Sequence, residues 1–530
     1  MAAATSSASA EQGESGKWLI AIAVVLAAAL EVLDTTIINV SLPHMQGSFS
    51  ASVDEITWVL TSYLVANGIM IPMTGWISAR YGRKRYFLSS VLLFISASAL
   101  CGLTTSLDEM VLFRLIQGAA GAAMIPLSQS ILMETFPPSE QQMAMAVWGL
   151  GLMVAPIMGP TLGGWITDNL SWRWNFYINV PVGLAAFTMV SWFVHDPSYL
   201  RQGPARSGKV DYLGIIYLAL GLGLLQIVLD RGERLDWFAS KWIWYGSIIS
   251  GLSLVFLPFH ELKTKDPILD IRIFFKPIFT LAVFITIIRS FVLYGTGVLL
   301  PIFLQDYMAY DAWKAGLVLA PRALGTMASM LFVGQIARRG KDTRLALGLG
   351  FVLMVLGLLQ MSEWSLNISM WEAIAPGIIL GAGMGLTFPI VSAVSLSVVP
   401  RERMGYAASL YNMMRNTGGA IGISYLTDVL VNHEQSHQSR LVNDVTVFKA
   451  WGLSHAAAGV PGVQHFAPLM SQVTSGQKQG LGLVYNLIQA QAAILSFNDI
   501  YRLLAFVTAL MIPTFIFFKQ SQLKGGQAVH

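Results

Sequence analysis

Residues 33–43 read LDTTIINVSLP and close an apolar segment that begins at Trp18. Asp34 lies within this segment at the depth of membrane hydrocarbon, where a carboxylate costs at least ~2.5 kcal/mol and usually faces a polar cavity. Glu31 lies about one helical turn earlier on the same face, and two acids on one face repel each other, which favours binding of a proton. The stretch therefore predicts a proton carrier in a membrane helix; the alternative is a structural polar contact between helices.

The composition is that of a protein with many membrane spans. The chain has 530 residues, of which 55% are hydrophobic and only 12% are charged. A single cysteine, Cys101, excludes an internal disulfide and a cysteine-based metal site. The formal net charge of +4 gives no indication of a nucleic-acid partner.

About fourteen apolar segments are long enough, at roughly 20 residues each, to span a membrane as helices. They lie near residues 18–42, 55–78, 86–106, 110–133, 142–168, 176–195, 211–229, 242–260, 279–303, 312–336, 343–362, 372–398, 405–430 and 499–519. We therefore expect an all-α polytopic membrane protein. The expected organisation is a disordered cytoplasmic tail at 1–16, an N-terminal six-helix bundle at 17–196, a linker with two extra transmembrane helices at 197–277, a C-terminal six-helix bundle at 278–520 with a long outer loop at 432–498, and a cytoplasmic tail at 521–530.

The Lys and Arg residues gather in alternate loops and indicate an orientation. Basic clusters lie at 80–85, 201–209, 263–276, 338–344 and 401–403, all in loops on the side of the N-terminal tail. By the positive-inside rule, both termini are expected to be cytoplasmic. The clusters at 80–85 and 338–344 follow the second span of each half, a weak internal symmetry that is typical of a two-half transporter.

The fifth span contains a run rich in proline and glycine, APIMGPTLGGW at residues 155–165. Its helix-bending and small residues are Pro156, Gly159, Pro160, Gly163 and Gly164. The prolines remove backbone donors and bend a helix, and glycines four residues apart allow another helix to approach closely. We interpret the run as a pivot or seal between two conformations, in preference to an ordinary tight helix crossing.

Several of these runs together resemble the major facilitator superfamily. The run at 155–165 resembles its antiporter signature, and 33–43 resembles the first-helix motif of its drug-exporting branch with fourteen helices. RLIQG at 114–118 matches a fourth-helix motif, and the runs at 172–183 and 229–232 resemble further marks of the EmrB/QacA family, especially its EmrB branch. The resemblance implies two six-helix bundles with an inserted helix pair, which export apolar or amphipathic toxic compounds in exchange for protons by alternating access.

The resemblance also implies roles for individual residues. Asp34 would be the protonation site of the first helix, and Arg114 would be the fourth-helix cation of proton coupling. Glu31, because of its place on the same helix face, would share the proton of Asp34 or tune it. A buried Arg114 needs an anion or carbonyl groups, so Asp34 or Glu31 is its expected partner; a static ion pair is the alternative. One motif departs from the family: residues 75–84 read GWISARYGRK, with Ala79 in place of an acid that is thought to latch the cytoplasmic side closed. This departure puts the latch in doubt and leaves the basic residues a role in topology.

Candidate residues for a substrate cavity are polar, aromatic or methionine residues within the spans. They are Gln117, Met124, Arg289, Tyr294, Phe388 and Tyr411. Methionine and aromatic side chains suit varied apolar drugs, although most such residues in a bundle simply pack. Arg289 is the deepest cation of the C-terminal half, and it would either line the cavity and favour anionic substrates or hold helix ends through carbonyl groups.

Enzyme signatures are missing from the sequence. There is no Walker loop and no HExxH motif, so we expect no cofactor, no resident metal and no enzymatic activity; His433 and His437 share helical spacing but give only a weak indication of a metal.

The expected partners are small-molecule drugs, protons and the lipid bilayer, with no nucleic acid. Resemblance to the EmrB branch adds a periplasmic membrane-fusion adaptor, an outer-membrane channel and a location in a bacterial cell inner membrane. The stretch at 432–498 would either meet such a partner or pack on the protein's own rim. The functional alternatives are an uptake symporter of the same fold and a non-transporting receptor or scaffold.

Overall fold

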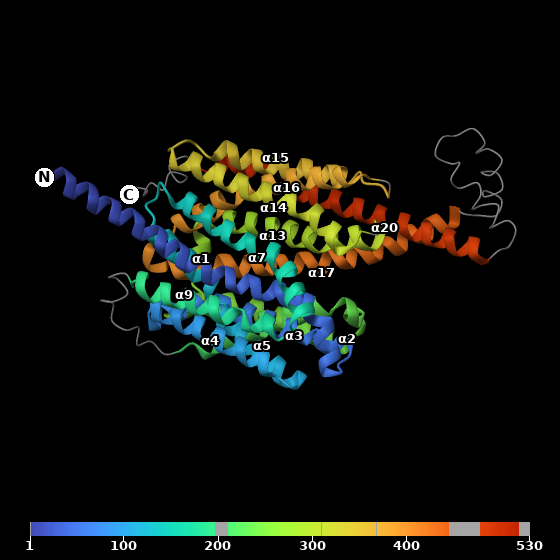
Figure 1. Cartoon of the computed structure of the whole chain (residues 1–530), viewed down its shortest axis with the longest axis horizontal. Helices are drawn as coiled ribbons and strands as arrows, with labels where there is room; N and C mark the ends of the chain where they lie inside the picture. The colour runs from blue at the N-terminus through green and yellow to red at the C-terminus, as the bar shows by residue number, and fades with distance from the viewer. Residues whose placement is uncertain (1, 197–209, 309, 367, 445–477, 519–530) are drawn as a thin grey trace.

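The computed structural model describes residues 2–196, 210–308, 310–366, 368–444 and 478–518, and in these ranges the chain forms helices and no strand (Figure 1). The N-terminal half consists of α1 (Ala2–Phe49), α2 (Val53–Ile56), α3 (Trp58–Tyr81), α4 (Arg83–Leu103), α5 (Leu107–Gly121), α6 (Met124–Thr135), α7 (Gln141–Asn169), α8 (Trp174–Tyr177) and α9 (Asn179–Phe193). Helix α1 runs through the stretch that was expected to be a tail. Helices α5 and α6 follow one another and together make one span.

The inserted pair and the C-terminal half follow in the same helical pattern. The inserted pair is α11 (Tyr212–Arg231) and α12 (Lys241–Lys263), joined by η1 (Glu233–Leu235) and η2 (Trp237–Ala239). The C-terminal half consists of η3 (Ile271–Phe275), α13 (Pro277–Ile302), η4 (Phe303–Tyr307), α14 (Ala312–Arg338), α15 (Arg344–Met361), α16 (Met370–Ser397), η5 (Arg401–Arg403), α17 (Met404–Asp444), α20 (Lys478–Ala509) and η7 (Ile512–Phe517).

The helices divide into apolar spans and one polar exception. Within the described ranges, 13 helical stretches are long and apolar enough to cross a membrane. Helix α17 is not among them, because residues such as Asn412, Arg415 and Asn416 interrupt its apolar character. Neighbouring helices cover Asn412 and Arg415, so α17 does not need an apolar surface at that depth. With α17 included, the stretches agree with the spans expected from the sequence.

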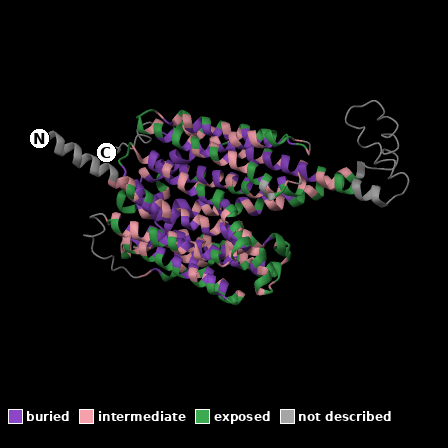
Figure 2. Cartoon of the chain, in the orientation of Figure 1, coloured by how far each residue is buried: buried purple, intermediate pink, exposed green. Residues whose placement is uncertain are grey.

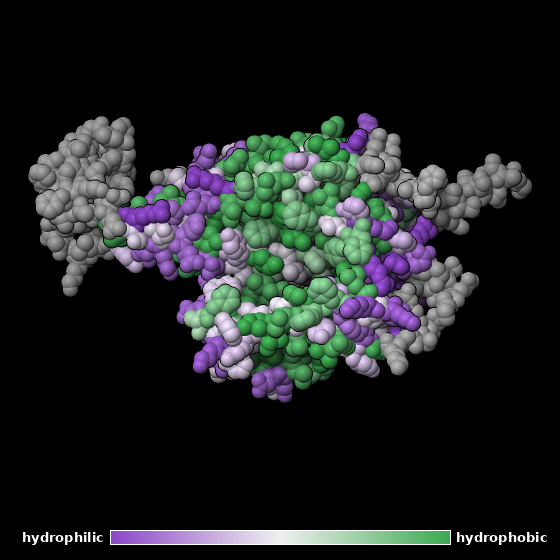
Figure 3. All heavy atoms as spheres, turned by 180° about the vertical axis from the view of Figure 1, so that it is seen from behind, coloured by the Kyte–Doolittle hydropathy of each residue, from purple (hydrophilic) through white to green (hydrophobic). Residues whose placement is uncertain are grey.

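The surface carries the pattern that a membrane requires. Hydrophobic residues form a band across the middle of the molecule, and hydrophilic residues lie toward its two ends (Figure 3). The start of α1 and the C-terminal end of α20 lie at the same end of the molecule (Figure 1). Helices α17 and α20 project together beyond the opposite end, so the flanks of the expected outer loop are helical. The middle of that loop, 445–477, lies outside the described residues.

The two halves contact each other near the end that carries the termini. Buried residues there form one apolar cluster that crosses from the N-terminal half to α16 and α17, and a second cluster fills the C-terminal half (Figure 2). A Cβ atom at Gly75 of α3 would lie 2.6 Å from Tyr406 Cα of α17, so the two backbones touch. Near the same end, the Asn412 amide donates to Gln129 Oε1 at 2.6 Å.

Helix α7 shows where this contact ends. Its first turns are largely buried, including Trp148, which is 0% exposed. Farther from the termini, Val154, Ile157 and Met158 are 40%, 39% and 49% exposed. The halves are therefore packed together around the first half of α7, whereas its second half carries both buried and exposed side chains.

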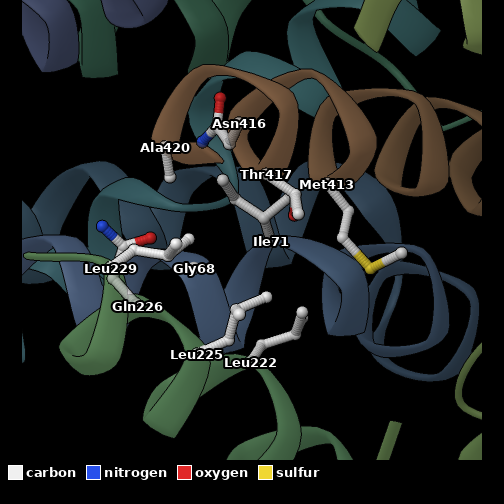
Figure 4. Close-up of a pocket in the computed structure, with 10 residues that line it drawn as sticks. All are labelled: Gly68, Ile71, Leu222, Leu225, Gln226, Leu229, Met413, Asn416, Thr417 and Ala420. Carbon is white, nitrogen blue, oxygen red and sulfur yellow. The ribbon is translucent and has the colours of Figure 1, made fainter. Parts of the chain in front are cut away.

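The inserted helix pair lies across the seam between the halves. Helix α11 lines a small cleft with α3 and α17, in which Leu222 and Gln226 face Gly68 and Asn416 (Figure 4). At the end away from the termini, the Thr61 hydroxyl of α3 donates to Asp230 Oδ2. The indole of Trp237 donates to Asp428 Oδ1 of α17 at 2.9 Å, so the pair is hydrogen-bonded to both halves.

Candidate functional site

A buried ion pair joins the first and fourth spans. Arg114 Nη1 of α5 lies 2.6 Å from Asp34 Oδ2 of α1, and both side chains are 0% exposed. The sequence left open whether Asp34 or Glu31 pairs with Arg114, and the structure places Asp34 there. The ion pair lies between α1 and α5 of the N-terminal half, so its charges are shielded from lipid.

Asp34 accepts hydrogen bonds at both of its oxygens. Gln117 Nε2 and Asn179 Nδ2 donate to Oδ1 at 2.8 and 2.6 Å, in addition to the Arg114 bond at Oδ2. Asn179 Nδ2 also lies 3.0 Å from Ser98 Oγ of α4, which ties α9 and α4 to the ion pair. Short bonds from a guanidinium and two amides are the environment of an ionised carboxylate.

Arg114 has further contacts that hold its position. Nε donates to the Val59 carbonyl at 3.1 Å, Nη1 also donates to Gln117 Oε1 at 2.8 Å, and the guanidinium lies 4.2 Å from the Tyr63 ring centroid. Nη2 is buried and has no hydrogen-bond partner among the described residues. If Asp34 took up a proton, Arg114 would therefore keep only neutral partners, and a buried charge without a counter-ion costs ~3–5 kcal/mol.

Glu31 forms a separate polar contact toward the other half. Asn67 Nδ2 of α3 donates to Glu31 Oε1 at 2.9 Å, while Oε2 has no partner among the described residues. The carboxyl is 5% exposed and interacts electrostatically with Arg415 of α17 and with Asp34. Glu31 thus lies between the Asp34 site and a cation of the C-terminal half.

The proline–glycine run packs on α1 beside Asp34. A Cβ at Gly159 would collide with Thr36 Oγ1, and one at Gly163 would lie 3.1 Å from the Ile37 carbonyl oxygen, whereas Gly164 is 3.7 Å from the nearest side-chain atom, Val40 Cγ1. Pro156 and Pro160 are exposed within α7, which continues through both of them. The small-residue face therefore brings the α7 backbone within one helical turn of Asp34, and its role as a pivot stays a prediction.

Four of the predicted cavity residues gather in or beside the C-terminal half. The Arg289 guanidinium lies 4.7 Å from the Phe388 ring centroid and interacts electrostatically with Tyr411, Tyr294 and Arg415. Phe388 in turn stacks on Trp148 of α7, with ring centroids 5.7 Å apart. The cluster therefore lies where the two halves meet.

The other two predicted cavity residues lie elsewhere. Gln117 is bonded to Asp34 and Arg114 within the N-terminal half, and Met124 is 0% exposed at the start of α6. The structure brings neither side chain to the Arg289 cluster. Residues 114 and 117 lie one turn apart on one helix face, and this spacing is the signal that relates Gln117 to the ion pair.

The sequence interpretation missed the amides that complete the site. Asn179 and Asn67 bind the two acids, and Trp148 carries the aromatic contact between the halves. Asn179 lies inside the run at 172–183 that was used only as a family mark. In the sequence, Asn179 is a polar residue at the start of an apolar segment, which indicates a buried polar contact but does not identify the partner.

In the motif where Ala79 replaces the acid of the family, the basic residues contact acids of the N-terminal half. Arg83 of the same motif forms a bidentate pair with Glu134 at the end of α6, at 2.7 and 3.0 Å. The backbone amide of Lys84 donates to Asp196 Oδ1 at 2.8 Å. These acids belong to the N-terminal half, whereas contact with the C-terminal half is made by Gly75.

Comparison with known proteins places the chain in a family. A family model for the Major Facilitator Superfamily matches residues 24–423. The chain is 33% identical over 509 residues to the multidrug export protein EmrB of Escherichia coli (strain K12), covering 96% of each protein. It is 32% identical over 494 residues to the fatty acid resistance protein FarB of Neisseria gonorrhoeae, covering 93% of this chain and 94% of that protein.

A solved structure shows the same fold at low identity. The proton:xylose symporter XylE bound to 6-bromo-6-deoxy-D-glucose aligns with a TM-score of 0.59 and 14% identity, covering 95% of this chain and 96% of that one. The identity is low enough that this likeness concerns the fold alone. The chain therefore belongs to the major facilitator superfamily, in the branch that contains the EmrB exporters.

Proposed function

We propose that the protein exports apolar or amphipathic toxic compounds in exchange for protons, by alternating access of a cavity between its two halves. Two of its relatives are named for multidrug export and fatty acid resistance. The observation that supports coupling to protons is the fully buried pair of Asp34 and Arg114. A buried intramembrane acid is a candidate proton carrier, because its negative charge is stable only while cationic and hydrogen-bond donors surround it. When these donors move away, the acid favours binding a proton. The protein acts as a transporter and not as an enzyme.

Protonation of Asp34 would act on the contact between α1 and α7. A neutral Asp34 would lose most of its attraction for Arg114, and the guanidinium would then favour an arrangement with another acceptor. Thr36 and Ile37, within one turn of Asp34, pack against Gly159 and Gly163. A shift of α1 would therefore reach α7, whose Trp148 contacts Phe388 of the other half.

Glu31 is proposed as the electrostatic contact between the two halves. Its unpartnered oxygen and its interaction with Arg415 support a role in tuning the proton site rather than in binding Arg114. Because Arg415 belongs to α17, relative movement of the halves changes the charge near Glu31. This supports a link between the conformation and the proton affinity of the site.

The cavity is proposed to favour substrates that carry an anionic group. No carboxylate of the described residues forms an ion pair with Arg289 or Arg415. Arg289 is 5% exposed and lies over the Phe388 ring. A compound with an apolar body and a negative head would match an aromatic surface beside an unpaired cation.

The orientation follows from the basic loops. With both termini cytoplasmic, the halves are packed together on the cytoplasmic side. We place the protein in a bacterial cell inner membrane, where the projecting ends of α17 and α20 would be periplasmic. They are the proposed contact for a membrane-fusion adaptor and, through it, an outer-membrane channel.

Transport in proteoliposomes tests the proposal. We would impose a proton gradient across vesicles that contain wild-type protein or Asp34→Asn and follow accumulation of a fluorescent anionic amphiphile. Wild type should move the compound against the proton flow, and Asp34→Asn should bind it but lose gradient-driven transport. Asp108→Asn, an exposed acid on α5, is the matched control and should transport normally.

Two results would contradict the proposal. Unchanged transport by Asp34→Asn would exclude Asp34 as the coupling acid. Movement of the compound in the same direction as the protons would indicate an uptake symporter instead.

A further inference from the structure

Three side chains that bind metals in many proteins meet between α17 and α20, at the edge of the bundle where the two helices leave it. His433 and His437 lie one turn apart on α17, and Asp499 lies on α20. The two helices run side by side where they leave the bundle (Figure 1). This cluster belongs neither to the Asp34 site nor to the Arg289 cluster, and it joins residues that are 62 and 66 positions apart in the chain.

The distances fit a shared ion. Asp499 Oδ2 lies 3.3 Å from His433 Nδ1 and 2.9 Å from His437 Nε2. One ligand atom from each of the three residues lies within 4.8 Å of the others. In a tetrahedral zinc site with bonds of about 2.0–2.1 Å, neighbouring ligand atoms are roughly 3.3 Å apart. Small side-chain rotations therefore suffice to place all three atoms around one ion.

The surroundings allow an ion to enter and hold the carboxylate in place. The side chains of His433, His437 and Asp499 are 46%, 19% and 32% exposed, so solvent reaches the cluster without a change of fold. Arg502 Nη1 lies 3.7 Å from Asp499 Oδ1, the oxygen that the histidines do not contact. Such an outer contact orients a ligating carboxylate.

We propose that His433, His437 and Asp499 form a binding site for a divalent transition metal such as Zn²⁺, which clips α17 to α20 at the edge of the bundle. Two imidazoles and one carboxylate are a donor set that suits zinc, with water in the fourth position. Zinc binds imidazole in its neutral form and a carboxylate in its charged form.

The clip would act within the C-terminal half. Both α17 and α20 belong to that half, so a metal between them would stiffen it without joining it to the N-terminal half. Zinc should therefore raise the thermal stability of the protein without preventing the movement of the two halves relative to each other. It would also fix the relative position of the two helix ends that flank 445–477.

Zinc binding to the full-length protein tests the site. The protein would be purified in detergent with an affinity tag that contains no histidine, stripped with EDTA and dialysed against ZnCl₂, and bound zinc would be measured by plasma mass spectrometry. Wild type should bind one ion per chain. His437→Ala and Asp499→Asn should each weaken zinc binding at least ~10-fold. Loss of a contact that only orients a metal ligand already weakens binding by about this factor, and loss of the ligand itself should weaken it at least as much.

Two further variants control for unfolding and for unrelated histidines. His437→Cys keeps a zinc ligand and should retain binding, which a merely structural histidine would not predict. His44→Ala removes an exposed histidine at the same end of the bundle and should bind as wild type does. Zinc should raise the unfolding temperature of wild type but not of Asp499→Asn.

Absence of stoichiometric zinc on the wild type would overturn the proposal. So would equal zinc binding by wild type, His437→Ala and Asp499→Asn.

Discussion

The ion pair of Asp34 and Arg114 should show strong energetic coupling in a double-mutant cycle. Asp34→Asn leaves Arg114 at 0% exposure without a counter-charge, and Arg114→Gln leaves the carboxylate equally buried. Removing one partner of a buried pair costs ~3–5 kcal/mol of unfolding free energy. In Arg114→Gln, Asp34 keeps its bonds from Gln117 and Asn179, at 2.8 and 2.6 Å, so the loss of unfolding free energy should lie toward the lower end of that range.

The double variant should lose much less stability than the two single variants together. It buries no unpaired charge, so we expect a coupling energy of about 2–3 kcal/mol, at the upper end for residues in contact. Unfolding free energies would be measured in mixed micelles with denaturing detergent, followed by the fluorescence of the 15 tryptophans.

An exposed ion pair provides the control for this cycle. Arg234 Nη1 and Asp54 Oδ1 are 3.4 Å apart, with side chains 48% and 75% exposed, and their coupling should stay below ~1 kcal/mol. Additive effects of Asp34→Asn and Arg114→Gln would refute the reasoning, because they would mean that the buried charges do not depend on each other.

Three further changes probe neighbouring contacts. Asn179→Ala removes a donor to Asp34 and should lower the free energy of unfolding by about 1–3 kcal/mol, because the buried carboxylate loses a hydrogen bond; unfolding in denaturing detergent checks this. Gly159→Val should abolish transport by forcing α7 away from α1, whereas Gly164→Ala, whose added Cβ meets only an ordinary contact, should transport normally; dye efflux from cells separates the two. Gly75→Val should separate α3 from α17, so that a cysteine introduced at this contact becomes accessible to thiol reagents. Gly68→Ala, whose added Cβ meets nothing within 4 Å, should leave such a cysteine protected.

The spans and the central acid could be predicted from the sequence because membrane solvation is a local property. A run of about 20 apolar residues must form a helix, and a carboxylate within it must find donors, whatever the rest of the chain does. These constraints singled out Asp34 as a buried acid, whereas Arg114 was named from its resemblance to a family motif; the role of both in proton coupling stays a prediction. Helix α17 also fits this logic, since its Asn412 and Arg415 require protein neighbours.

The choice of partners could not be predicted, because it depends on how helices far apart in the chain pack. Asn179 reaches Asp34 across 145 positions, and Glu31 pairs with Asn67 instead of Arg114. Gln117 was assigned to the cavity, but helix rotation directs it to the ion pair. For the stretch at 432–498, the apolar runs indicate an amphipathic extension, but hydropathy reports exposure to lipid and does not show that α17 and α20 pack on each other beyond the bundle.

The inserted helix pair has a consequence for the transport cycle. Asp230 is bonded to Thr61 of one half, and Trp237 is bonded to Asp428 of the other. A helix pair that is hydrogen-bonded to both halves cannot move with both of them. One of these two hydrogen bonds must therefore break when the halves change their separation at the end away from the termini. The bond that persists determines which half the inserted pair moves with, and the bond that breaks adds its free energy to the cost of the conformational change.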